Sequence, residues 1–121
     1  MGYDYMFFRP LRAGPMSTWP AEQPPPLGTV AEVKARLAEV FPGIHWRAPN
    51  FRMATWDDGE EHAEFIVAPE PDGTVRSVGM THCARADAER LARHFGPAVI
   101  ALDPQEMTVY SVAGGAWTPT E

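Results

Sequence analysis

Hydrophobic and polar residues alternate in several short segments of this chain, which is the pattern of β-strands. Residues 3–8 carry aromatic and other apolar side chains on much of both faces and therefore predict a central strand. The pairs Asp58-Gly59 and Asp72-Gly73 predict turns between antiparallel strands. The predicted strands are residues 3–8, 44–47, 51–56, 60–68, 74–83, 98–102 and 107–112.

Two other segments have apolar residues at the spacing of an amphipathic helix. The first follows Thr29, and Thr29 and Glu32 have the spacing of a capping box, in which each side chain accepts a hydrogen bond from the other residue's backbone. Pro42-Gly43 ends this helix. The second helix is predicted over residues 84–95, with acidic residues early and basic residues late, as the helix dipole favours.

Two segments have no regular pattern. Residues 9–28 contain six prolines and predict a long loop, which would be either a strap across the core or a flap over a binding site. Residues 114–121 predict a loosely held tail.

The order of these elements predicts a single α+β domain over residues 1–121. We expect two helices packed on one face of a mainly antiparallel sheet, in the order β-α-β-β-β-α-β-β, with three or four strands between the helices depending on whether residues 44–47 form one. A ferredoxin-like arrangement with additions is the leading topology.

The charge of the chain limits its partners. The 121 residues include sixteen acidic and ten basic side chains, which give a net charge of -6. Nucleic acids and anionic membranes are therefore disfavoured as partners, whereas a basic protein would be attracted.

The composition also bears on where the protein works. One cysteine cannot form an internal disulfide, and no segment approaches the roughly twenty apolar residues of a membrane span. Basic residues are almost all arginine, which suggests GC-rich coding. We therefore expect a cytoplasmic protein of a bacterium.

The common catalytic motifs are absent from the sequence. It has no P-loop, no glycine-rich dinucleotide motif, no Gly-x-Ser-x-Gly, no His-Glu-x-x-His and no Cys-x-x-Cys. We therefore expect no cofactor and assign no catalytic residue.

One weak constellation could still carry chemistry. If Asp72-Gly73 closes a tight hairpin, His62 lies opposite Cys83 and Glu64 lies opposite Thr81. An imidazole, a carboxylate and a thiol on one side of the sheet are ligand types that zinc accepts. The alternative is that His62 and Glu64 have no joint role and that Cys83 is a buried, inert thiol, and we assign no metal site.

The stretch from 56 to 61 is the other candidate. Asp57, Asp58, Glu60 and Glu61 surround Gly59 at a predicted turn, with Trp56 beside them. Such a turn is either a solvated end of a hairpin or a contact for a basic partner, with Trp56 as an aromatic anchor.

These observations lead to two hypotheses. The first is a non-catalytic protein-binding protein, either an immunity-type inhibitor of a basic toxin or an accessory subunit, with Trp56, Asp57, Asp58, Glu60 and Glu61 as its contact residues. The second is a small enzyme or a ligand- or metal-binding domain that uses His62, Glu64 and Cys83.

Overall fold

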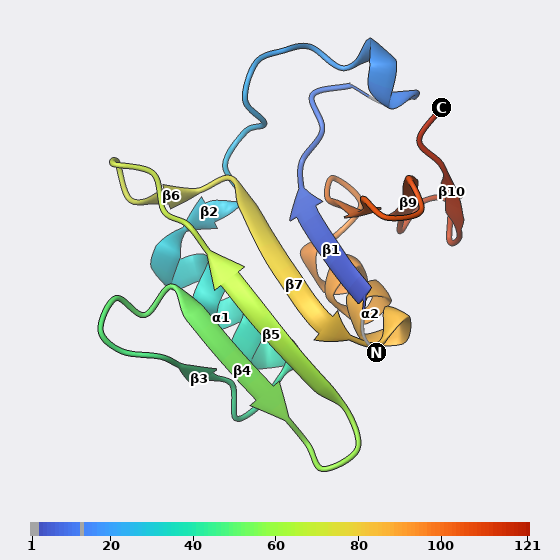
Figure 1. The fold of residues 1–121 in the computed structure, drawn as a ribbon. Helices are drawn as coiled ribbons and strands as arrows, with labels where there is room; N and C mark the ends of the chain where they lie inside the picture. The colour runs from blue at the N-terminus through green and yellow to red at the C-terminus, as the bar shows by residue number, and fades with distance from the viewer. Residues whose placement is uncertain (1–2, 13) are drawn as a thin grey trace.

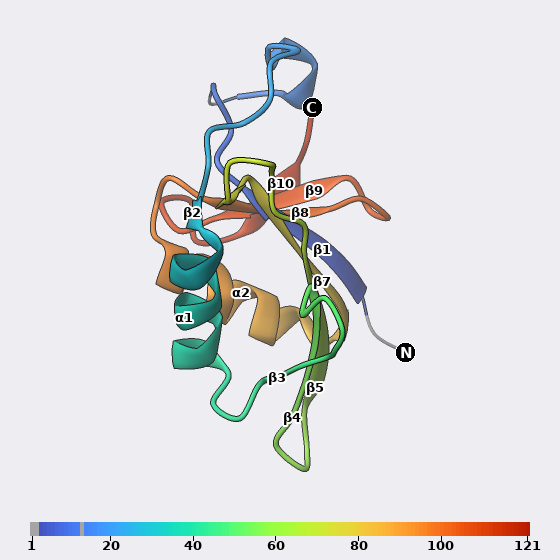
Figure 2. The same cartoon turned by 90° about the vertical axis from the view of Figure 1, so that its left-hand side faces the viewer.

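A large antiparallel sheet with two helices on one face forms the centre of the molecule (Figures 1 and 2). This computed structural model describes residues 3–12 and 14–121, so residues 1, 2 and 13 of the predicted domain and loop lie outside the described residues. The elements, in chain order, are β1 (Tyr3–Phe8), a 3-10 helix (Met16–Thr18), β2 (Gly28–Thr29), α1 (Val30–Val40), β3 (His45–Trp46), β4 (Met53–Asp57), β5 (His62–Val67), β6 (Thr74–Val75), β7 (Ser77–Cys83), α2 (Arg85–Phe95), β8 (Ile100–Asp103), β9 (Thr108–Ser111) and β10 (Trp117–Pro119).

The eight strands of the main sheet are ordered β10-β9-β8-β1-β7-β5-β4-β3, and every neighbouring pair is antiparallel. The predicted α+β class is therefore confirmed. β1 lies between β7 and β8, so the predicted central position of this strand is confirmed. A separate two-stranded sheet joins β2 to β6.

Both helices begin and end close to the predicted residues. The Thr29 hydroxyl accepts a hydrogen bond from the Glu32 amide at 3.2 Å, and the Glu32 carboxylate accepts one from the Thr29 amide at 2.9 Å. The predicted capping box is therefore confirmed. α2 follows Ala84 and ends at Gly96, whose φ of 98° is a conformation that glycine adopts readily.

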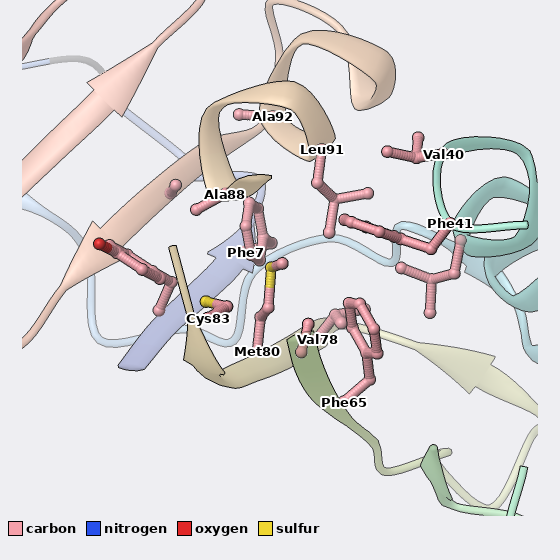
Figure 3. Close-up of a cluster of buried hydrophobic side chains, with 14 of the residues drawn as sticks. Phe7, Val40, Phe41, Phe65, Val78, Met80, Cys83, Ala88, Leu91 and Ala92 are labelled. Atoms are coloured by element: carbon pink, nitrogen blue, oxygen red, sulfur yellow. The ribbon is translucent and has the colours of Figure 1, made fainter. Parts of the chain in front are cut away.

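The core lies between the helices and the face of the sheet that they cover. Figure 3 shows Phe7, Phe65 and Met80 of the sheet beneath Ala88 and Leu91 of α2, all of them fully buried. The opposite face of the sheet, here called the outer face, has no helix against it among the described elements (Figure 2). Met6, Ile66 and Met53 lie on the outer face in one cross-strand row with Gly79, and each is more than 40% exposed.

The proline-rich segment is fixed near its C-terminal end and near its middle. Leu27 is buried, and its amide donates to the Val75 carbonyl at 2.7 Å. Near the 3-10 helix, the Ser17 amide and hydroxyl donate to the Glu121 carboxylate at 3.0 and 2.8 Å. These contacts fit the strap interpretation better than that of a free flap.

The predicted loose tail is instead a strand with an anchor. β10 pairs with β9, and the Trp117 ring lies 5.4 Å from that of Tyr5 and 5.5 Å from that of Tyr110. The Trp117 indole N–H donates to Glu89 at 2.7 Å. Contacts of one partly buried aromatic side chain thus help to order a segment whose glycine and proline content indicates a loop.

Candidate functional site

The acidic turn joins β4 to β5 and projects from one end of the sheet (Figure 1). The Asp58 carboxylate accepts hydrogen bonds from the amides of Glu60 and Glu61 at 2.9 and 2.7 Å. These backbone donors lower the pKa of Asp58 below its ordinary value. Asp57 accepts from the Gly59 amide at 2.6 Å. Two of the four predicted contact carboxylates therefore hold the turn in shape.

This turn lies close to the first turn of α2, where Asp87 is located. Asp87 is only 3% exposed, and one of its oxygens, Oδ1, accepts from the Arg90 guanidinium at 2.9 Å. Arg90 also donates to the Val40 carbonyl at the end of α1 at 2.9 Å and lies 5.5 Å from the centre of the Phe41 ring. Arg90 thereby joins α2 to the end of α1.

The carboxyl groups of Glu61 and Asp87 interact where the acidic turn comes near α2. The charge of Asp87 raises the pKa of Glu61, as does a hydrogen bond that a protonated Glu61 makes to Asp87. Desolvation and the charges of Asp58 and Glu60 add to the rise. Asp58, Glu60, Glu61 and Asp87, with Arg90, are here called the acidic corner.

Sequence analysis did not identify Asp87 as a member of this site. An acidic residue in the first turn of a helix is explained by the helix dipole alone, so the local pattern gives no reason to look further. Its burial and its proximity to Glu61 arise only when the chain folds and brings the start of β5 near the first turn of α2. One signal in the sequence could have pointed to a larger site. Acidic side chains outnumber the basic side chains near them.

Trp56 does not belong to the exposed site. Its side chain is 4% exposed, lies edge-on to Phe41 with ring centres 4.9 Å apart, and donates to the Pro42 carbonyl at 3.2 Å. The idea of Trp56 as a surface anchor is therefore wrong. Its cross-strand partner is the buried Ala63, and residues paired across two strands point to the same face of the sheet. Alternation along β5, extended to β4, would therefore have placed Trp56 inside.

A second polar cluster lies on the outer face around Glu64. Its carboxylate is within 4.0 Å of three groups: His62 Nε2 at 3.7 Å, His82 Nε2 at 3.8 Å and Arg47 Nη2 at 3.9 Å. His62 also lies 3.8 Å from Asp57. The predicted pair of His62 and Glu64 is therefore together, and Glu64 lies opposite Thr81 as expected.

Cys83 does not belong to this cluster. The pairing of β7 with β1 is irregular near its end, His82 has a φ of 52°, and Cys83 pairs with Tyr3. One extra residue reverses the alternation of side chains, so His82 is exposed and Cys83 is buried in the core (Figure 3). Burial, and next the charge of Asp87, raise the pKa of the thiol to about 12.

The alternative in which Cys83 joins His62 and Glu64 is therefore wrong, because it assumed unbroken alternation along residues 74–83. Cys83 is buried, as the other interpretation expected. A thiol with a raised pKa is also a poor nucleophile at neutral pH. Within residues 3–12 and 14–121, no three His, Cys, Asp or Glu side chains are arranged to hold a metal ion.

A cleft of about 660 Å³ lies elsewhere, between the proline-rich segment and the end of the sheet. Pro15, Trp19, Ile100 and Val109 are among its lining residues. None of the candidate residues lines it, so the cleft and the acidic corner are separate features.

Comparison with known proteins adds no assignment. No family model matches the sequence, and no curated protein or solved structure is significantly similar to it. Among the described residues, neither helix has the length and apolar character needed to cross a membrane. The function must therefore be argued from the site itself.

Proposed function

We propose that this chain is a non-catalytic protein-binding protein of a bacterial cytosol, and that its partner is a basic protein. The protein would be either an immunity-type inhibitor of a basic toxin or an accessory subunit. The contact surface is the acidic corner with the neighbouring Asp57.

The observation that carries this proposal is the concentration of carboxylates at one end of the molecule. Asp57, Asp58, Glu60 and Glu61 lie on the turn and Asp87 lies next to it, with Arg90 as the cation that Asp87 binds. A surface with a strong excess of one charge speeds the encounter with an oppositely charged protein and disfavours other partners. The buried position of Trp56 means that the carboxylates, without an aromatic anchor, provide the recognition.

A charge-reversal experiment tests the proposal. The variant Glu60→Lys/Glu61→Lys keeps the two aspartates that hold the turn, and the variant Asp4→Lys/Glu22→Lys changes the net charge equally at exposed positions elsewhere. Wild-type protein should recover one stoichiometric basic partner from the native cell. The first variant should bind this partner at least about tenfold more weakly, since close charge pairs in interfaces contribute more than 1.4 kcal/mol.

The control variant should bind as the wild type does, and binding should weaken as salt is added, because ions screen exposed charges. If both variants bind equally well, the acidic corner is not the contact surface. If purified protein recovers no basic partner from the native cell, the proposed function fails altogether.

We also propose a ferredoxin-like arrangement for the centre of the fold. Its support is the order β8-β1-β7-β5 of the four central strands, with α1 after β1 and α2 after β7. In this description, β3 and β4 at one edge and β9 and β10 at the other are additions.

A further inference from the structure

The floor of the cleft beside the proline-rich segment is the outer face of the sheet at β8 and β9. Leu102 pairs with Met6 of the outer face and with Val109 of β9, so Val109 lies on that face as well. Side chains two residues apart on a strand share a face, which places Ile100 and Ser111 there too. Val109, Ile100 and Ser111 all line the cleft.

The opposite wall of the cleft is the proline-rich segment. Pro10, Pro15 and Trp19 line the cleft from this side. The indole N–H of Trp19 donates to the Gly14 carbonyl at 3.2 Å, and its ring lies edge-on to that of Phe8 with ring centres 5.7 Å apart. This wall therefore consists of stiff proline rings and an indole ring whose position is fixed by contacts on two sides.

Hydrogen bonds hold the two walls at a fixed separation. The Met16 amide donates to the Thr120 carbonyl at 2.7 Å, and the Ser17 amide and hydroxyl donate to the Glu121 carboxylate at 3.0 and 2.8 Å. The cleft of about 660 Å³ is thus already formed in the free protein. Sites for small molecules are commonly preformed clefts of roughly 300–1,000 Å³, because a ligand then binds without the cost of ordering the chain around it.

The polar groups that line the cleft offer hydrogen-bond donors rather than acceptors. The Arg12 guanidinium makes one hydrogen bond, to the Thr18 carbonyl at 3.3 Å, and no ion pair within the described part of the chain. The Ser111 hydroxyl accepts from the Gly114 amide at 3.1 Å and still has its own proton to donate. Glu121, the one acidic residue among the described lining residues, already accepts two hydrogen bonds from Ser17. An acceptor group on the ligand suits this lining best.

We propose that this cleft binds a small aromatic carboxylate. The aromatic ring lies between Trp19 and the outer-face side chains of Ile100 and Val109, and the carboxylate accepts hydrogen bonds from Arg12. Ring-to-ring contact adds to the free energy of apolar burial, and a few polar groups fix the orientation of the ligand. The inference goes beyond the proposed function, because the cleft shares no residue with the acidic corner.

Titration with three probes of similar shape tests the class of ligand. The probes 2-naphthoate, 2-naphthalenemethanol and 2-naphthylmethylammonium share one ring system and carry an anionic, a neutral and a cationic group. The amide NMR signals of the protein are followed while each probe is added at neutral pH and constant ionic strength. We expect 2-naphthoate to shift the signals of Ser111 and Thr118 saturably, with a Kd of about 1 mM or lower. The other two probes should bind at least about threefold more weakly, because neither brings an anion to Arg12.

Matched variants test the position of the ligand. Arg12→Gln should weaken 2-naphthoate binding at least about threefold and change 2-naphthalenemethanol binding less than about twofold, since only the anion uses the charge. Arg52→Gln removes an exposed arginine that does not line the cleft and should bind as the wild type does. Val109→Trp fills the cleft and should abolish the saturable shift. Ile66→Trp adds the same bulk at an exposed position on the same face and should leave binding unchanged.

Four results would overturn the inference. They are no saturable binding of 2-naphthoate up to about 10 mM, equal or tighter binding of either other probe, unchanged 2-naphthoate binding by Arg12→Gln, and unchanged binding by Val109→Trp. If Val109→Trp does not fold, the Arg12→Gln and Arg52→Gln pair decides the question. The partner experiment changes only the acidic corner, so the proposed function and this inference can fail separately.

Discussion

Glu61 and Asp87 show how a single residue gains its properties from the packing around it. From sequence, Glu61 is one of several acids on a turn and Asp87 is an ordinary helix-start acid, and the turn itself is correctly predicted. Their proximity, the burial of Trp56 and the reversal at Cys83 all depend on contacts between distant segments. The sequence therefore identifies candidate site residues by their type. It does not predict whether their side chains are exposed or which neighbours they contact.

The pair gives a prediction about stability and pH. The pKa of Glu61 is raised in the folded protein, so between its unfolded and folded values the native state binds more protons. The free energy of unfolding contributed by this group therefore falls as pH rises through that window. Glu61→Gln should make the protein more stable than wild type at pH 7, and the gain should disappear below the ordinary pKa of glutamate.

Urea unfolding of both proteins at pH 7 and near pH 4 measures this difference. Glu60→Gln is the control and should give a smaller gain at pH 7. A Glu61→Gln variant that is less stable than wild type at pH 7 would show that the Glu61 carboxylate has a favourable contact there.

Some elements are predicted better from the sequence than others. The reason is that some are determined by neighbouring residues and others by contacts with distant parts of the chain. α1 and α2 are confirmed because caps, apolar spacing and glycine ends all lie within a few residues. Residues 74–83 were predicted as one strand but form two, because β6 pairs with β2 and β7 pairs with β5 and β1. β10 was missed because its stability comes from the distant partners of Trp117.

The capping box of α1 allows a quantitative test at this scale. Thr29→Ala removes the hydroxyl that accepts from the Glu32 amide and should lower the free energy of unfolding by about 1 kcal/mol. Thr118→Ala, at an exposed position of β10, is the control and should cost less. Urea unfolding gives both values, and equal losses would mean that the cap adds nothing to the stability of the whole protein.

The arrangement of the whole molecule is a sheet with one covered and one open face. The alternation of residues in β4 and β5 predicts which side chains are inside, and the helices cover that side. Sequence patterns also place β1 in the middle, as observed. The order of the other strands could not be derived locally, because it depends on which of many possible pairings buries the most apolar surface.

Neighbouring residues of β5 test this two-faced arrangement. Phe65 is fully buried and Ile66 is 44% exposed on the outer face. Phe65→Ala should lower the free energy of unfolding by about 3–5 kcal/mol, because it leaves a cavity in the core. Ile66→Ala should cost no more than about 1 kcal/mol, the span of strand preferences. Similar losses for both variants would indicate that the outer face is covered in solution.

The central position of β1 has a consequence for how the chain folds during synthesis. β1 is made before both of its neighbours in the sheet, because Tyr5 pairs with Met80 and Met6 pairs with Leu102. The hairpin of β4 and β5 can form while β1 still has no partner. Long-range pairings of this kind slow folding. An apolar segment that has been synthesised before its partner strands is unpaired for that time and can aggregate. β1 is therefore the segment where a ribosome-associated chaperone would have most to protect.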